Sequence, residues 1–176
     1  MDLQIVLELI LFILPAYVAN AMPVILGGGP KLDSGKSLGD GRRILGDGKT
    51  LYGLIGGLMC GILTAAALAA TIPDLFATTA AGFGTKLLTG GLLAAGALCG
   101  DLAGSFFKRR TGMERGQPSL LLDQLTFLFF ALAFAAPYFP TQAGIPGLVF
   151  LAVLTFVLHI LFNVIAHRLK LKSVPW

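Results

Sequence analysis

Residues 50–72 read TLYGLIGGLMCGILTAAALAATI, an uninterrupted run without a charged side chain. A helix needs about 20 mostly apolar residues to cross the hydrocarbon core of a bilayer. This run therefore predicts a membrane-spanning helix. Its glycines also allow neighbouring backbones to approach closely, and Gly53 and Gly57, like Gly96 and Gly100 farther along the chain, have the four-residue spacing of small residues that pack helices in membranes.

The rest of the chain extends this prediction to about five spanning helices. Hydrophobic residues make up 56% of the sequence and charged residues only 12%, with a mean hydropathy of +0.84. A soluble domain carries about 25% charged residues. We therefore predict an all-α, polytopic membrane protein that forms a single domain over residues 1–176. The expected helices cover residues 3–26, 50–72, 86–107, 119–136 and 147–166.

The positions of lysine and arginine predict how the chain is oriented. Five of the 13 lie in the loop 27–49, four in the loop 108–118 and three in the tail after residue 166, which leaves only Lys86 for the opposite side. Basic residues are enriched in the cytoplasmic loops of membrane proteins. We therefore expect a cell-membrane protein with its N-terminus outside and its C-terminus in the cytoplasm, whose cytoplasmic loops form the active site.

The loop 27–49 has the composition of a phosphate-binding segment. It holds three consecutive glycines and two Asp-Gly turns followed by cations. Clustered backbone N–H groups together with Arg and Lys can hold phosphate oxygens. The alternative is a solvated basic loop attracted to anionic lipid headgroups. The candidate substrate-binding residues here are Arg42, Arg43, Asp47, Lys49 and Thr50.

Two aspartates flank the loop 108–118 inside otherwise apolar stretches. Asp101 precedes the end of the third expected helix, and Asp123 follows the start of the fourth. A charge at the centre of a spanning helix costs about 2.5–3.5 kcal/mol, and less near the interface, so both need partners. Carboxylates with open positions suit Mg²⁺, which also binds substrate phosphates. The alternative is that both aspartates pair with nearby cations, namely Lys108, Arg109 and Arg110.

Further polar side chains follow helical spacing near these aspartates. Ser105 and Arg109 lie four and eight residues after Asp101, so one helix face presents a carboxylate, a hydroxyl and a guanidinium. This order suits a complex of a metal ion with a triphosphate. Gln124, directly after Asp123, places an amide where the apolar pattern favours leucine.

A polar stripe also lies on the fifth expected helix. Its residues are spaced by four: His159, Asn163 and His167. Such a stripe is typical of interhelical hydrogen bonds in membranes. The functional alternative is that these side chains, Asn163 in particular, form a polar wall of a substrate cavity.

Four segments together resemble the archaeal CDP-archaeol synthases, and the resemblance covers essentially the whole chain. These segments are DGRRILGDGKT at 40–50, GDLAGSFFKRR at 100–110, Asp123-Gln124-Leu125 and the ending Val174-Pro175-Trp176. The resemblance implies an enzyme that uses Mg²⁺ to join CTP to 2,3-di-O-geranylgeranylglyceryl phosphate, giving CDP-archaeol and pyrophosphate. The implied partners are CTP, the isoprenoid ether lipid phosphate and membrane lipids, without nucleic acid.

Roles for the candidate residues follow from this implied reaction. Asp101 and Asp123 would bind Mg²⁺, and Lys108, Arg109 and Arg110 would bind phosphates. The cations of the loop 27–49 would close over the nucleotide, with Thr50 and Ser105 as hydroxyl donors. These roles are hypotheses about how two mutually repelling phosphates are brought together.

Three other functions are compatible with a basic membrane protein. A transporter or channel for a small anion is the main alternative, although transporters commonly contain inverted repeats and none is detectable in this sequence. A CDP-alcohol phosphotransferase would have further aspartates at fixed spacing after its Asp-Gly motif, and this chain lacks that pattern. A basic membrane scaffold without catalytic activity is the third.

Overall fold

The computed structural model describes residues 1–113, 117 and 119–171, apart from the side chains of Leu120, Leu121 and Asp123. This part of the chain is helical and has only two isolated β-bridges. The prediction of an all-α fold is confirmed. The helices are α1 (Leu3–Ala21), α2 (Pro23–Leu26), α3 (Leu51–Thr71), α4 (Gly82–Arg110), α5 (Leu120–Phe134), the 3₁₀ turns η1 (Ala136–Tyr138) and η2 (Thr141–Ala143), and α6 (Gly144–Arg168).

Four of the described segments are long and apolar enough to cross a membrane. They are Leu3–Leu26, Leu51–Thr71, Gly82–Arg110 and Thr141–Arg168, and α5 contributes a shorter apolar stretch, Gln124–Phe134. With α5, these segments account for the five helices expected from the sequence. Helix α5, the fourth of the expected helices, is short, because its 15 residues extend over only about 22 Å.

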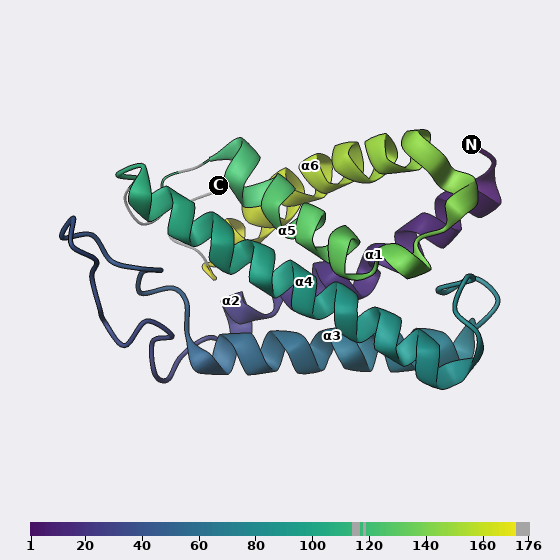
Figure 1. Cartoon of the computed structure of the whole chain (residues 1–176), viewed down its shortest axis with the longest axis horizontal. Coiled ribbons are helices and arrows are strands. Elements are labelled where there is room, and N and C mark those ends of the chain that lie inside the picture. Colours follow the sequence, from purple (N-terminus) through teal and green to yellow (C-terminus); the bar gives the residue numbers. More distant parts are fainter. Residues whose placement is uncertain (114–116, 118, 172–176) are drawn as a thin grey trace.

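Successive helices alternate in direction, so the connecting segments gather at two ends of the molecule (Figure 1). The loop 27–49, the end of α4, the start of α5 and the end of α6 lie toward one end, which we call the charged end. The N-terminus and the connections 72–81 and 135–143 lie at the other. Asp101 and the start of α5, which contains Asp123, are therefore on the same side of the bundle.

Some helices differ from the expected bounds for reasons visible in the structure. The first expected helix, 3–26, is divided because α1 ends at Ala21 and Pro23 begins α2; proline favours the first position of a helix, where it needs no N–H partner. The third is longer than 86–107. It begins at Gly82, four residues before Lys86. Lys86 therefore lies within the helix, where its buried ammonium donates to the carbonyls of Pro73, Phe76 and Ala77.

At its other end, α4 continues to Arg110, with Lys108, Arg109 and Arg110 in its last turn. Cations there interact favourably with the negative end of the helix dipole. The fourth helix is shorter than 119–136, because the chain changes to a 3₁₀ turn that contains Pro137. The last helix extends beyond 147–166 at both ends, from Gly144 to Arg168.

The central helix α4 packs against α1, α3 and α5. Its contact with α5 is made by glycines at four-residue spacing, Gly96, Gly100 and Gly104. A Cβ atom on Gly100 would lie only 2.5 Å from the Cα of Phe127, and one on Gly104 would lie 2.7 Å from the carbonyl oxygen of Leu122. The two backbones are thus in direct contact, as the spacing of Gly96 and Gly100 predicts.

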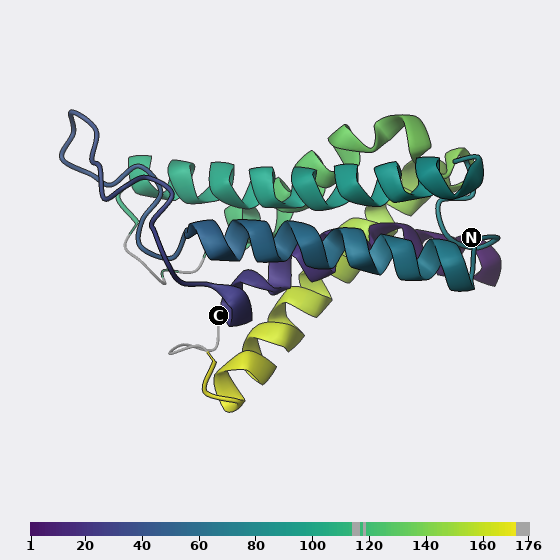
Figure 2. The same cartoon turned by 90° about the horizontal axis from the view of Figure 1, so that it is seen from below.

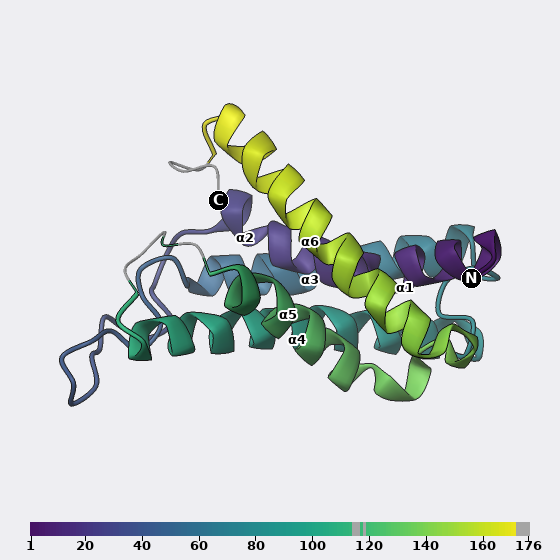
Figure 3. The ribbon, with the colours of Figure 1, turned by 90° about the horizontal axis from the view of Figure 1, so that it is seen from above.

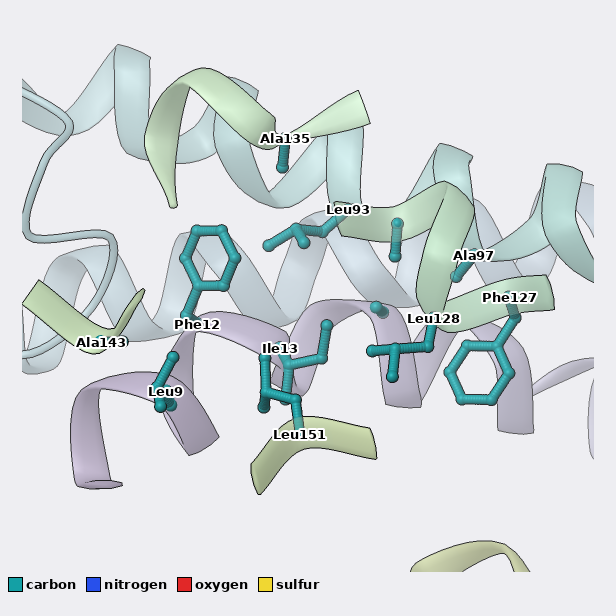
Figure 4. Close-up of a cluster of buried hydrophobic side chains, with 12 residues drawn as sticks. Leu9, Phe12, Ile13, Leu93, Ala97, Phe127, Leu128, Ala135, Ala143 and Leu151 are labelled. Atoms are coloured by element: carbon teal, nitrogen blue, oxygen red, sulfur yellow. The ribbon is translucent and has the colours of Figure 1, made fainter. Parts of the chain in front are cut away.

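A second close approach joins α3 to α1, because a Cβ on Gly57 would lie 2.6 Å from the carbonyl oxygen of Ala19. The apolar core lies between α1, α4, α5 and the first half of α6, as Figure 4 shows for Phe12, Leu93, Phe127 and Leu151. Small residues on α3 and α4 and large ones on α1 and α5 therefore build a close-packed bundle.

The last helix, α6, contacts the rest of the bundle mainly through its first half. Tyr17 on α1 and Thr155 on α6 share a hydrogen bond of 2.8 Å between their hydroxyl oxygens. Beyond this point, α6 diverges from α3 and α4 (Figures 2 and 3). The second half of α6, which carries His159 and Asn163, therefore leaves the bundle as it nears the charged end.

Candidate active site

The loop 27–49 is organised around the buried carboxylate of Asp33. Its side chain is 1% exposed and accepts a hydrogen bond of 2.6 Å from Arg43. It also accepts from the backbone N–H groups of Gly35, Leu45 and Gly46 at 3.0–3.1 Å. The loop thus has a defined conformation around this carboxylate.

Asp33 is a structural residue that the sequence analysis did not single out. The signal available was the tripeptide Asp33-Ser34-Gly35, since an aspartate often accepts from the N–H two residues later in an Asx turn. Gly35 has a φ of +78°, and Gly46, which also donates to Asp33, has a φ of +96°. Both values lie in the left-handed region that favours glycine, which explains two of the glycines in this loop.

Hydrogen bonding keeps Asp33 ionised. Burial alone raises the pKa of this carboxyl, but the Arg43 guanidinium and the three backbone N–H groups outweigh it and hold the pKa well below the ordinary value of 3.8. A carboxyl whose pKa falls on folding stabilises the fold above its unfolded pKa, and this stabilisation is lost as the pH falls through the folded pKa.

We therefore expect the loop to keep its conformation from neutral pH down to about pH 4 and to lose it only in stronger acid. The backbone amide resonances of Leu45 and Gly46 in the detergent-solubilised protein would report this. In Asp33→Asn the same two resonances should already be displaced at neutral pH, because the neutral amide is a weaker acceptor. Unchanged resonances in Asp33→Asn would contradict the assignment.

The loop is fastened to the end of α4 by reciprocal arginine contacts. Arg110 binds Asp40 at 2.6 Å and donates to the carbonyl oxygens of Arg42 and Arg43 at 3.1 and 2.5 Å. In return, Arg42 donates to the carbonyl oxygen of Arg110 at 2.6 Å. The tip of the loop and the last turn of α4 therefore form one unit.

A further pair joins the loop to the membrane helix itself. The Lys49 Nζ lies 2.5 Å from Oδ2 of Asp101, and the two side chains are 24% and 31% exposed. One could expect Asp101 to pair with the cations of its own helix, but its ion partner comes from the loop, 52 residues away in sequence. Lys49 therefore brings the glycine-rich loop to the carboxylate on α4.

The other predicted residues of the loop pair among themselves. Arg43 bridges Asp33 and Asp47, and Lys31 lies 2.5 Å from Asp47. These contacts with Lys31 and Arg43 lower the pKa of Asp47. Thr50 caps α3, since its hydroxyl oxygen accepts from Gly53 N and also from Gly28 N.

One face of α4 is turned toward this loop. Besides Asp101 with Lys49, the side chain of Arg109 lies beside Gly46, whose added Cβ would be 3.9 Å from the Arg109 Cδ. Ser105 stands between Asp101 and Arg109 in the same helical row. The predicted face of carboxylate, hydroxyl and guanidinium is thus formed, and it faces residues 46–49.

On α5, the backbone of Asp123 lies in the first helical turn, and the contact of Gly104 with Leu122 places that turn at the level of Gly104, less than one turn of α4 beyond Asp101. The side chain of Asp123 lies outside the described residues, as do residues 114–116, 118 and 172–176. Gln124 is buried at 2% exposure, and its Nε2 has no hydrogen-bond partner among the described residues. Asn163 lies apart from these groups, on the diverging half of α6.

The described residues fit a magnesium ion held by few protein ligands. They contain no group of three or more His, Cys, Asp or Glu side chains that could enclose a metal. Asp101 nevertheless holds a cation, the Lys49 ammonium, at its carboxylate. Mg²⁺ is usually bound by one or two carboxylates together with water and substrate phosphates, so a small carboxylate set beside basic groups suits it.

The fold and this site define a multi-pass membrane protein with a charged, phosphate-compatible site at one end of an apolar helix bundle. Residues 2–176 match the family model described as "CarS-like: CDP-archaeol synthase". The chain belongs to this family, and it is therefore an enzyme, a membrane-bound transferase of archaeal lipid biosynthesis.

Individual relatives agree over the full length of the chain. It is 46% identical to the CDP-archaeol synthase of Thermococcus onnurineus, with 100% of both chains covered. It is also 46% identical to that of Methanococcus aeolicus, over 99% of this chain and 98% of the relative. A solved structure described as an intramembrane enzyme for archaeal membrane lipids biosynthesis matches with a TM-score of 0.71 and 41% identity, over 88% of this chain and 91% of that one.

Proposed function

We propose that the protein transfers the cytidylyl group of CTP to 2,3-di-O-geranylgeranylglyceryl phosphate, giving CDP-archaeol and pyrophosphate. A lipid phosphate oxygen attacks the α-phosphorus of CTP. The bond from the α-phosphorus to the bridging oxygen then breaks, and pyrophosphate leaves with the bonding electrons. The attacking phosphate is already ionised at neutral pH, so no general base is required.

The observation that carries this proposal is the ion pair of Lys49 with Asp101. It brings a glycine-rich, basic loop against a carboxylate on a membrane helix at one end of the bundle. A water-soluble triphosphate and a membrane-bound phosphate can meet only at the membrane surface, where such an end of the bundle would lie. The family membership indicates the same chemistry.

The basic residues would position and neutralise the phosphates, which is the main contribution of proteins to phosphoryl transfer. We assign Lys108, Arg109 and Arg110 to phosphates, Arg42, Arg43 and Lys49 to the nucleotide, and Ser105, Thr50 and Gln124 to hydrogen bonds with substrate. The buried Gln124 amide has a donor with no partner in the described part of the chain, which suits such a bond. Asn163 would contact the lipid substrate on the diverging side of α6.

Asp101 and Asp123 would hold Mg²⁺. When bound, the ion would supply positive charge that reduces the cost of negative charge on the leaving pyrophosphate. The two carboxylates would fix where the positive charge of the ion lies relative to Arg109 and Lys108. The isoprenoid chains of the acceptor would remain in the bilayer, and the charged end would face the cytoplasm, with the N-terminus outside.

The proposal predicts a specific reaction for the purified protein. Pyrophosphate release should require CTP, a lipid phosphate acceptor and Mg²⁺ together, and should favour ether-linked isoprenoid acceptors over ester-linked ones. The measurement is a coupled pyrophosphate assay with CTP compared with ATP, GTP and UTP. Pyrophosphate release without an acceptor would contradict the proposed transfer, and uptake of an anion into proteoliposomes without turnover would favour the transporter alternative.

A further inference from the structure

At the charged end, acidic side chains form ion pairs with basic ones. Each described aspartate there has a lysine or arginine partner: Asp33 with Arg43, Asp40 with Arg110, Asp47 with Lys31 and Arg43, and Asp101 with Lys49. Four of these five ion pairs join residues within the loop or fasten the loop to the last residue of α4. The pair of Lys49 with Asp101 differs, because it occupies the carboxylate assigned above to the metal.

We propose that Lys49 is a built-in competitor for the metal, which occupies the Asp101 carboxylate until a nucleotide arrives. The inference rests on the proposed function, since it takes Asp101 as the metal-binding carboxylate. At 2.5 Å, the Lys49 ammonium stands where a cation would bind Oδ2 of Asp101. A metal ion must displace the ammonium, and the displaced ammonium needs another anion.

A triphosphate supplies that anion. Lys49 lies at the end of the glycine-rich loop, directly after Asp47-Gly48, so its long side chain can turn from Asp101 to a phosphate without movement of α4. The exchange keeps the charge balanced, because Asp101 gains the metal while Lys49 gains a phosphate. Metal and nucleotide binding are therefore coupled, and each favours the other to the same extent.

The contacts around Lys49 make this exchange cheaper than it would be at the buried Asp33 pair. Asp33 is buried and accepts four hydrogen bonds, whereas the Lys49 and Asp101 side chains are 24% and 31% exposed. Partly exposed ion pairs contribute little net stability and can break. Lys49 therefore acts as a reversible competitor, whereas the ion pairs of Arg43 and Arg110, beside the roles assigned to these residues above, also hold the loop in its conformation.

The test is Mn²⁺ binding in the absence of nucleotide, followed by electron paramagnetic resonance of the free ion. Lys49→Met should bind Mn²⁺ about fivefold more tightly than the wild type, because the competing state is removed. Lys31→Met is the matched control. It removes the same charge from the same loop, but the partner of Lys31 is Asp47, so its Mn²⁺ affinity should equal that of the wild type.

Two further measurements distinguish this inference from the proposed function. With a non-hydrolysable CTP analogue present, the wild type and Lys49→Met should bind Mn²⁺ with nearly equal affinity. Asp101→Asn should lose the tight Mn²⁺ site with or without the analogue. If Asp101→Asn loses the site but Lys49→Met binds as the wild type does, the competition is wrong and the metal assignment stands. If Asp101→Asn keeps the site, both are wrong.

Discussion

Asp101→Asn should reduce CTP-dependent pyrophosphate release about a thousandfold, equivalent to about 4 kcal/mol of transition-state stabilisation. The substitution keeps the size of the side chain but removes the charge that would hold the metal and that binds Lys49. Asp123→Asn should act in the same direction. The measurement is the initial rate of pyrophosphate release in detergent micelles that contain the lipid acceptor.

The control for this result is Asp74→Asn. Asp74 is exposed in the connection 72–81, at the opposite end of the bundle, so its loss should leave the rate unchanged. Each variant must also elute from size exclusion as the wild type does. A correctly folded Asp101→Asn enzyme with a rate within about tenfold of the wild type would refute the metal assignment, because about 1.4 kcal/mol is too little for loss of a metal ligand.

Gly100→Ala should destabilise the bundle by about 2 kcal/mol, lowering the unfolding temperature by about 4–8 °C. The new methyl group would overlap the backbone of α5, with the Phe127 Cα only 2.5 Å away. A backbone cannot rotate aside as a side chain does, so α4 and α5 must separate. The measurement is the fraction of protein that remains monodisperse after heating.

Gly91→Ala is the matched control on the same helix. Its new Cβ would meet only the Ile62 Cγ1, at 3.9 Å, an ordinary contact. Because alanine favours helix over glycine by about 1 kcal/mol, this variant should be as stable as the wild type or more stable. Equal unfolding temperatures for Gly100→Ala and Gly91→Ala would show that the close approach of α4 and α5 is not needed for stability.

Much of this fold follows from local sequence patterns. Uncharged runs predict the helices, and the spacing of Gly96 and Gly100 predicts a close contact because small side chains permit it wherever the partner lies. The divided first helix was harder to predict. Membrane helices tolerate proline, as α1 does at Pro15, so sequence alone does not show that the chain would restart at Pro23.

The site was predictable in composition but not in pairing. The residue types at Lys49, Asp101 and Arg109 indicate phosphate and metal chemistry wherever they meet. Which carboxylate Lys49 binds depends on how the loop folds back on α4, a contact across 52 residues. Asp33 was missed for a related reason: a buried structural carboxylate and a solvent-exposed one look alike in sequence until their donors, such as Leu45 N, are placed.

The buried Lys86 has a consequence for how the molecule sits between two leaflets. Its ammonium is bound by three backbone carbonyls, so it offers no free positive charge to headgroups on its own side. Basic side chains contribute about 1 kcal/mol each when they reach an anionic surface. The accessible basic side chains are therefore gathered at the charged end, and a leaflet rich in acidic lipids attracts the end of the molecule where the loop 27–49 lies.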